Sequence, residues 1–126
     1  MEHTIAVLKA ISQETRLRIL MLLAETELCS CQLGEVLGVS QPGISQHMSV
    51  LKHAGLVSER RSGTRVHYQL VRSRLVQVLH WLTAAIEAPR SIASQSVNWN
   101  KLDRLSADRQ LLCEQSDSEM QGVDRQ

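Results

Sequence analysis

The chain is poor in cysteine, and its sequence shows neither a long apolar run nor the pattern of a secretory signal in its first residues. Three cysteines among 126 residues is an odd and small count, which argues against a disulfide framework. No apolar stretch approaches the roughly 18 to 20 residues that a membrane-spanning helix needs. Residues 1–10 lack the basic stretch and apolar core of a secretory signal. We therefore expect a cytoplasmic protein with no membrane partner, in which Cys29, Cys31 and Cys113 are reduced.

The net charge of +1 hides an uneven distribution of charge along the chain. Residues 40–74 hold six Lys and Arg against one carboxylate, a net +5, whereas residues 1–39 and residues 75–126 each carry a net −2. A basic block of this kind suits one surface that meets phosphates while the rest of the protein does not. With 43% hydrophobic and 21% charged residues, the chain has the composition of one globular domain of ordinary size.

Hydrophobic spacing predicts two helices before residue 26. Ile5, Leu8 and Ile11 recur every three residues, which predicts a short amphipathic helix within residues 3–12. Ser12 is a suitable N-cap for a second helix that continues through Leu23. Since that helix is apolar on all sides, we expect it to lie at the centre of the core.

A helix-turn-helix is predicted between residues 30 and 55. A short helix fits within residues 30–37, with Gly38 as its left-handed stop. Ser40 can cap the next helix, Pro42 is tolerated in its first turn, and Gly55 ends it. The face of this helix opposite its apolar stripe offers groups that can bind base edges or phosphates. The candidate DNA-binding residues there are Ser40, Gln41, Ser45, Gln46, His47, Ser49 and Lys52.

A basic hairpin follows the helix-turn-helix. Apolar and polar residues alternate between Leu56 and Leu70, and Ser62-Gly63 supplies the turn. The position of this hairpin identifies it as the wing of a winged-helix domain. Near its tip we expect Arg60, Arg61 and Arg65 to contact the DNA backbone or minor groove. The predicted fold is therefore mostly α with a β-hairpin wing, a winged helix-turn-helix.

The last long helix is predicted from about Ser73 to Ala88, where Pro89 ends it. It carries two apolar stripes, of which one can serve the core while the other needs a partner, most simply the same helix of a second subunit. The stripes are Leu75, Leu79, Leu82 and Ile86, then Val78, Trp81 and Ala85. We expect a homodimer formed through the terminal helices, a DNA-binding and dimerisation domain over residues 1–89, and a polar, partly ordered tail over residues 90–126 with a short helix around residues 101–112.

Two thiols, Cys29 and Cys31, stand one residue apart just ahead of the helix-turn-helix. Soft thiolates select thiophilic ions and are poor ligands for Mg²⁺ and Ca²⁺. In a helix, residues two apart point about 200° away from each other, so both sulfurs reach one ion only where residues 29–31 are not helical. Our hypothesis is that ion binding opens the start of the following helix and thereby moves the recognition helix.

As a set, five stretches resemble the ArsR/SmtB family of small winged-helix repressors, over about residues 5–88. They are AISQETRLRIL (10–20), ELCSCQL (27–33), VSQPGISQH (39–47), LKHAGLV (51–57) and GTRVHYQL (63–70). The ELCSCQL stretch is similar to the arsenite-responsive branch, whose members leave their operator when trivalent arsenic or antimony binds the thiolates. The resemblance implies that Cys29 and Cys31 bind As(III) or Sb(III) as inducer. It also implies a homodimer that places two recognition helices in successive major grooves of double-stranded operator DNA.

One departure from the family pattern leaves the third ligand open. Familiar members carry a further cysteine three residues after the second, and here that position is Gly34. A third ligand would come from Cys113, from water or hydroxide, or from a small cellular thiol, or the thiol pair suffices by itself.

Alternative sensing chemistries on the same fold are another thiophilic ion, such as Cd²⁺, Pb²⁺ or Zn²⁺, and thiol oxidation. Cadmium and lead sensors of the family add amino-terminal cysteines, and none precedes Cys29. Zinc sensors place ligand pairs on the last helix, which here offers only His80, with Thr83 three residues on. A thiol oxidoreductase would need a Cys-x-x-Cys motif near a βαβ pattern, and the sequence has neither, so we expect no enzyme.

Overall fold

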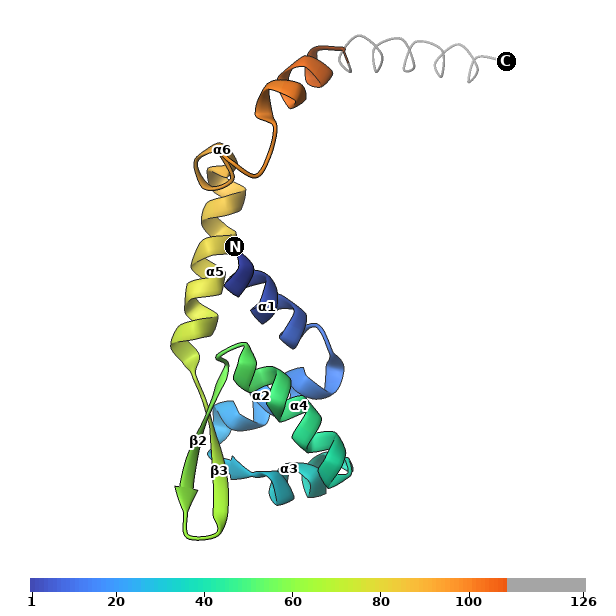
Figure 1. Cartoon of the computed structure of the whole chain (residues 1–126), viewed down its shortest axis with the longest axis vertical. Helices are drawn as coiled ribbons and strands as arrows, with labels where there is room; N and C mark the ends of the chain where they lie inside the picture. Colours follow the sequence, from blue (N-terminus) through green and yellow to red (C-terminus); the bar gives the residue numbers. More distant parts are fainter. Residues whose placement is uncertain (109–126) are drawn as a thin grey trace, which may run out of the picture. The chain divides into compact units, whose positions relative to one another are not determined.

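The computed structural model describes residues 1–108, and Cys113 lies outside them. Residues 1–92 form helices α1–α6 and strands β1–β3, and residues 99–108 are also helical (Figure 1). In chain order they are α1 (Glu2–Ile11), α2 (Glu14–Glu25), β1 (Leu28–Cys29), α3 (Ser30–Leu37), α4 (Gln41–His53), β2 (Val57–Ser62), β3 (Arg65–Leu70), α5 (Arg72–Glu87) and α6 (Pro89–Ile92). The mostly helical fold with a hairpin wing is confirmed.

The first two helices form where hydrophobic spacing places them, but two details differ. The buried face of α1 consists of Thr4, Val7 and Ala10, whereas Ile5 is 42% exposed. The N-cap of α2 is Gln13, whose side chain accepts a hydrogen bond from the Arg16 N–H at 2.8 Å. The prediction of Ser12 at that position is wrong, because Ser12 follows α1 as its C-cap.

The core of the amino-terminal unit, Met1–Leu82, is built around α2, α3 and α4. The residues of these helices that are almost fully excluded from solvent are Ile19, Leu20, Leu23, Leu33, Ile44, Met48 and Leu51. The predicted place of α2 in the core is confirmed, although its opposite side exposes Leu17 and Met21. The α4 helix packs on α1, α2 and α3, which fixes the orientation of its outer face.

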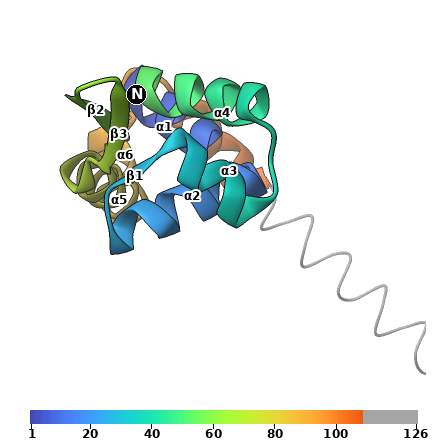
Figure 2. The same cartoon turned by 90° about the horizontal axis from the view of Figure 1, so that it is seen from below.

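A small antiparallel sheet has the strand order β1-β3-β2. β2 and β3 are the predicted wing, and they pair from Val57 opposite Leu70 to Ser62 opposite Arg65. The two-residue strand β1 was not predicted. It adds to the free edge of β3, with Cys29 opposite His67, and α3 follows it directly (Figure 2). The thiol segment is therefore hydrogen-bonded to the wing.

The buried side of α5 combines members of both predicted stripes. Val78 is buried, and Leu75 and Leu82 pack against the core, whereas Val76 and Leu79 are exposed. The spacing of three and then four residues places the core-facing set on one helical face. No helix within residues 1–108 is long and apolar enough to span a membrane.

The chain after Leu82 belongs to a second compact unit. Pro89 begins α6, and Arg90 lies over the ring of Trp99 at 5.4 Å from its centroid and pairs with Asp103. Helical structure from residue 99 to residue 108 agrees with the start of the helix predicted around residues 101–112, whose end lies outside the described residues. The boundary between a domain over residues 1–89 and a tail over residues 90–126 stays a prediction.

Candidate nucleic-acid interface and thiol site

The outer face of α4 presents the predicted polar set. Ser40 is the N-cap of the helix, and its Oγ accepts a hydrogen bond from the Gly43 N–H at 3.3 Å. Seven candidates were expected on this face. Six of them are exposed and His47 is half-buried, the exposed ones being Ser40, Gln41, Ser45, Gln46, Ser49 and Lys52. The helix therefore has the shape and polarity to enter a major groove, with its buried stripe of Ile44, Met48 and Leu51 facing the core.

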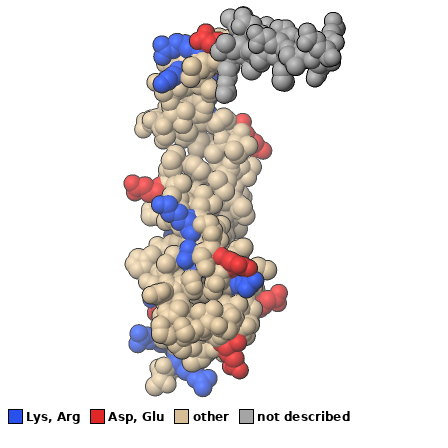
Figure 3. All heavy atoms as spheres, turned by 90° about the vertical axis from the view of Figure 1, so that its right-hand side faces the viewer, with Lys and Arg blue, Asp and Glu red and all other residues tan. Residues whose placement is uncertain are grey.

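The wing adds exposed cations that differ in how they are paired. Figure 3 shows Lys and Arg groups at the level of the hairpin, with carboxylates beside them. Lys52 Nζ lies 2.5 Å from Glu59 Oε1, and this hydrogen bond raises the pKa of Lys52. Arg61 and Arg65 have no carboxylate within ion-pair distance in the part of the chain that the structure describes. These two side chains are therefore the most available to phosphate.

The two thiols occupy different environments at the junction of β1 and α3. Cys29 is buried and extended, at φ −88° and ψ 166°, and it is the N-cap of α3. Gln32 Oε1 accepts a hydrogen bond from the Cys29 N–H at 3.0 Å. Cys31 is exposed and lies in the first turn of α3, which begins at Ser30. Since residue 31 is helical here, the extended segment expected for chelation by both sulfurs is absent from this conformation.

Gly34 occupies the position where the resemblance would place a third cysteine, and the structure leaves no room there for a side chain. A Cβ at this residue would lie 2.9 Å from the carbonyl oxygen of Val39 and 3.1 Å from Gln41 Nε2. The contact with Val39 involves backbone, which a side-chain rotation cannot relieve. The close approach of α3 to the turn before α4 thus requires glycine, and this turn of α3 carries no third thiol.

The thiol segment has a direct link to the recognition helix. Gln41 Nε2 donates to the carbonyl oxygen of Ser30 at 3.3 Å, and Ser30 stands between the two cysteines. The sequence analysis predicted that Gln41 lies on the DNA-binding face but did not predict this contact. No local sequence pattern connects two residues that are eleven positions apart and lie in different helices.

Glu27 is a site residue that the sequence analysis did not single out. Hydrogen bonds from Arg60 and then from Gln69 lower the pKa of its carboxyl group. The available signal was a carboxylate directly before the thiol segment, but only the β1–β3 pairing brings the wing to it.

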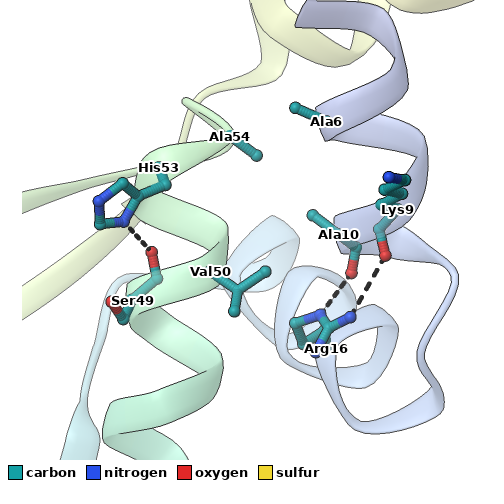
Figure 4. A pocket seen from close by; sticks show the side chains of 8 residues that line it. All are labelled: Ala6, Lys9, Ala10, Arg16, Ser49, Val50, His53 and Ala54. Carbon is teal, nitrogen blue, oxygen red and sulfur yellow. Dashed lines mark hydrogen bonds between the residues drawn. The ribbon is translucent and has the colours of Figure 1, made fainter. Parts of the chain in front are cut away.

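A hollow of about 350 Å³ lies between α1 and α4 (Figure 4). Its polar side chains are bonded locally: Arg16 Nε donates to the carbonyl oxygen of Ala10 at 2.6 Å, and His53 Nδ1 donates to that of Ser49 at 2.8 Å. Within residues 1–108, no cluster of three or more His, Cys, Asp or Glu side chains is placed to hold a metal ion. The candidate ligands in this part of the chain remain Cys29 and Cys31.

Fold and site together define a winged helix-turn-helix DNA-binding regulator. The sequence profile of the bacterial regulatory protein arsR family matches residues 13–59. The arsenic resistance transcriptional regulator ArsR1 of Pseudomonas putida is 35% identical over 100 residues, which cover 79% of this chain and 73% of that protein. The chain belongs to the ArsR/SmtB family of transcriptional repressors, which are DNA-binding proteins and not enzymes.

Further comparisons agree on family and fold. The arsenical resistance operon repressor of Escherichia coli K12 is 46% identical over 67 residues, which are 52% of this chain and a little over half, 57%, of that repressor. An ArsR-like regulator from Rhodococcus sp. RHA1 matches with a TM-score of 0.62 at 25% identity, covering 87% of this chain and 92% of that one. The homodimeric winged helix-turn-helix domain of Mb0332 from Mycobacterium bovis gives 0.57 at 26% identity, covering 77% and 88%.

Proposed function

We propose that this protein is a homodimeric repressor that leaves its operator when As(III) or Sb(III) binds the thiolates of Cys29 and Cys31. The observation that carries the proposal is the contact between Gln41 of the recognition helix and the carbonyl of Ser30, between the thiols. Relatives named for arsenical resistance support the choice of inducer.

Binding of both thiols to one atom requires a change at the start of α3. Cys29 is extended and Cys31 is in the first helical turn, so bringing the sulfurs together unwinds that turn. The hydrogen bonds of Cys29 N–H to Gln32 and of Gln41 to Ser30 are then lost or rearranged. The start of α4 consequently shifts relative to the domain that presents it to DNA.

The chemistry is exchange of arsenic–oxygen bonds for arsenic–sulfur bonds. Arsenous acid, As(OH)₃, reacts with two thiols to form two As–S bonds, and each thiol proton leaves with a hydroxide as water. Arsenic keeps its +3 state, and its third valence retains a hydroxyl group or takes a further thiol. Cys113 and small cellular thiols are the candidates for that third sulfur.

The proposed dimer places α1 and α5 at the subunit interface. Ile5 on α1 and Val76 on α5 are 42% and 48% exposed, although each lies on a helix whose other side packs on the core. Burial of such apolar area against a second copy is favourable. The structure of Mb0332, which is described as homodimeric, supports the formation of a dimer. Two recognition helices then bind half-sites about one helical turn apart.

The test is a titration of an operator duplex bound by the full chain, followed by fluorescence anisotropy. Arsenite and antimonite release the wild type, whereas Cys29→Ser and Cys31→Ser stay bound at the same concentrations. Cys113→Ser identifies the third ligand: weaker release than in the wild type assigns it to Cys113, and unchanged release assigns it to hydroxide or a small thiol. Zinc, cadmium and a peroxide form the other arms, and preferential release by one of them assigns the thiols to that alternative inducer. Release by arsenite that survives loss of both Cys29 and Cys31 contradicts the proposal.

A further inference from the structure

Glu27 connects the thiol segment to both strands of the wing. Arg60 on β2 donates through Nε to Glu27 Oε1 at 2.8 Å, and its Nη2 forms an ion pair with the same oxygen at 2.6 Å. Gln69 on β3 donates through Nε2 to Glu27 Oε2 at 2.7 Å. His67 Nδ1 lies 4.0 Å from Oε1. Both carboxylate oxygens are thus occupied by wing side chains, and the Glu27 side chain is only 24% exposed.

The backbone makes this connection short. Glu27 directly precedes β1, in which Leu28 pairs with Tyr68 and Cys29 pairs with His67 of β3. One residue separates Glu27 from Cys29, so a movement of Cys29 toward Cys31 is transmitted to Glu27 through two peptide units. Each peptide unit is planar, and the pairing with β3 restrains the soft dihedral angles between the units.

The ion pair between Glu27 and Arg60 links the thiol segment to a side chain that we expect to bind DNA. Arg60 is one of the wing cations expected at the phosphate backbone, and Glu27 holds its guanidinium group from the protein side. Arg is suited to this because its planar fork can serve a carboxylate while the rest of the group stays exposed. The position of Glu27 therefore sets where Arg60, and with it the hairpin, stands relative to α4.

We propose that Glu27 is a positioning residue that docks the wing onto the thiol segment and passes occupancy of the thiols to the wing. This inference rests on the proposed function. Gln41 links the thiol segment to the recognition helix, and Glu27 links the same segment to the second DNA-contacting element. Inducer binding then displaces the helix and the wing together.

The experiment compares Glu27→Gln with Glu25→Gln in the full chain. Glu25 is exposed at the end of α2 and makes no ion pair within residues 1–108. Glu25→Gln therefore removes the same charge two residues away from Glu27 without breaking a contact to the wing. For each protein, arsenite binding is measured without DNA through the ultraviolet absorbance of arsenic–thiolate bonds. The operator Kd is measured by anisotropy at fixed salt with and without saturating arsenite. The ratio of the two Kd values is the coupling factor.

Glu27→Gln is expected to bind arsenite within about twofold of the wild type and to lower the coupling factor at least about fivefold, the smallest change typical of allosteric coupling. Glu25→Gln should match the wild type in both. Amide hydrogen exchange across residues 57–70 should rise on arsenite binding in the wild type and change little in Glu27→Gln. Glu27→Asp, which keeps the charge, should recover part of the coupling.

An unchanged coupling factor in Glu27→Gln, or an equal loss in Glu25→Gln, overturns the inference while the proposed function stands. If Glu27→Gln fails to fold by circular dichroism, Gln69→Ala removes one wing contact from the same carboxylate and should also lower the coupling factor. Full coupling in that variant overturns the inference as well. A wild type that binds its operator equally with and without arsenite instead refutes the proposed function, and this inference with it.

Discussion

Replacement of Gly34 by alanine should destabilise the protein although it improves helix propensity. Alanine is favoured over glycine within a helix by about 1 kcal/mol. Against this, the added Cβ lies 2.9 Å from the carbonyl oxygen of Val39, and overpacking of this kind costs about 1 to 3 kcal/mol. The carbonyl belongs to backbone, and the Val39 N–H is itself bonded to the Gly34 carbonyl at 3.1 Å, so relief requires moving the turn before α4. We place the steric cost at the upper part of that range and expect a net loss of about 1 to 2 kcal/mol.

The measurement is urea denaturation followed by far-ultraviolet circular dichroism. All variants are compared at one protomer concentration, because the apparent stability of a dimer depends on concentration. Gly43→Ala is the control, since its Cβ would meet only side-chain atoms of Val39 and Ser40, and the cost of moving the Ser40 cap is offset by the better helix propensity of alanine. It should keep the wild-type stability to within about 1 kcal/mol. A Gly34→Ala variant as stable as the wild type would show that the turn yields freely. In that case, lack of space for a side chain at residue 34 would not explain why the third cysteine is missing.

Three further variants test the core, the wing and the carboxyl-terminal unit. Leu33→Ala on α3 removes a fully buried side chain and should lower the free energy of unfolding by about 2 to 5 kcal/mol, measured by the same denaturation. Arg65→Gln should weaken binding of all DNA sequences alike and reduce the slope of log K against log salt by about 1, since we expect this cation to contact phosphate. Arg90 lowers the pKa of Asp103, so their pairing stabilises the folded segment above the ordinary aspartate pKa, and this contribution is lost as the pH falls through the lowered value. The indole N–H resonance of Trp99 should follow that loss in the wild type, and Asp103→Asn should remove the pH dependence.

The helix-turn-helix could be predicted because local chemistry determines its ends. Gly38 adopts the left-handed conformation at φ 67° that stops α3, and Ser40 caps α4 with Pro in its first turn, as the sequence indicated. The hairpin turn follows in the same way but lies one residue later than the predicted Ser62-Gly63, at Gly63 with φ 63° and Thr64, because Ser62 still pairs with Arg65. Each of these features depends on residues within one turn of each other, which is the range over which sequence patterns carry information.

The features that connect the site could not be predicted, because they depend on residues distant in the chain. The strand at Leu28–Cys29 is too short to show an alternating pattern, and it forms only because β3 offers an unpaired edge. Glu27 meets Arg60 across 33 residues, and no local signal reports that distance. The apolar face of α1 was predicted only in part for a related reason: Leu8 and Ile11 pack against the core, but the packed fold leaves Ile5 exposed.

The free energy needed to release the protein from its operator is similar in size to that of the hydrogen bonds that inducer binding would break. A near-complete swing between two states requires about 5.5 kcal/mol of differential binding. In each protomer, unwinding the first turn of α3 removes the bonds of Cys29 to Gln32 and of Gln41 to Ser30. At about 0.5 to 1.5 kcal/mol net for each hydrogen bond, this amounts to about 1 to 3 kcal/mol in one subunit and about 2 to 6 kcal/mol in the proposed dimer. One occupied subunit therefore does not complete the swing, and release should depend on arsenite more steeply than a single site allows. A simple hyperbolic release curve at low protein concentration would show that one thiol pair suffices.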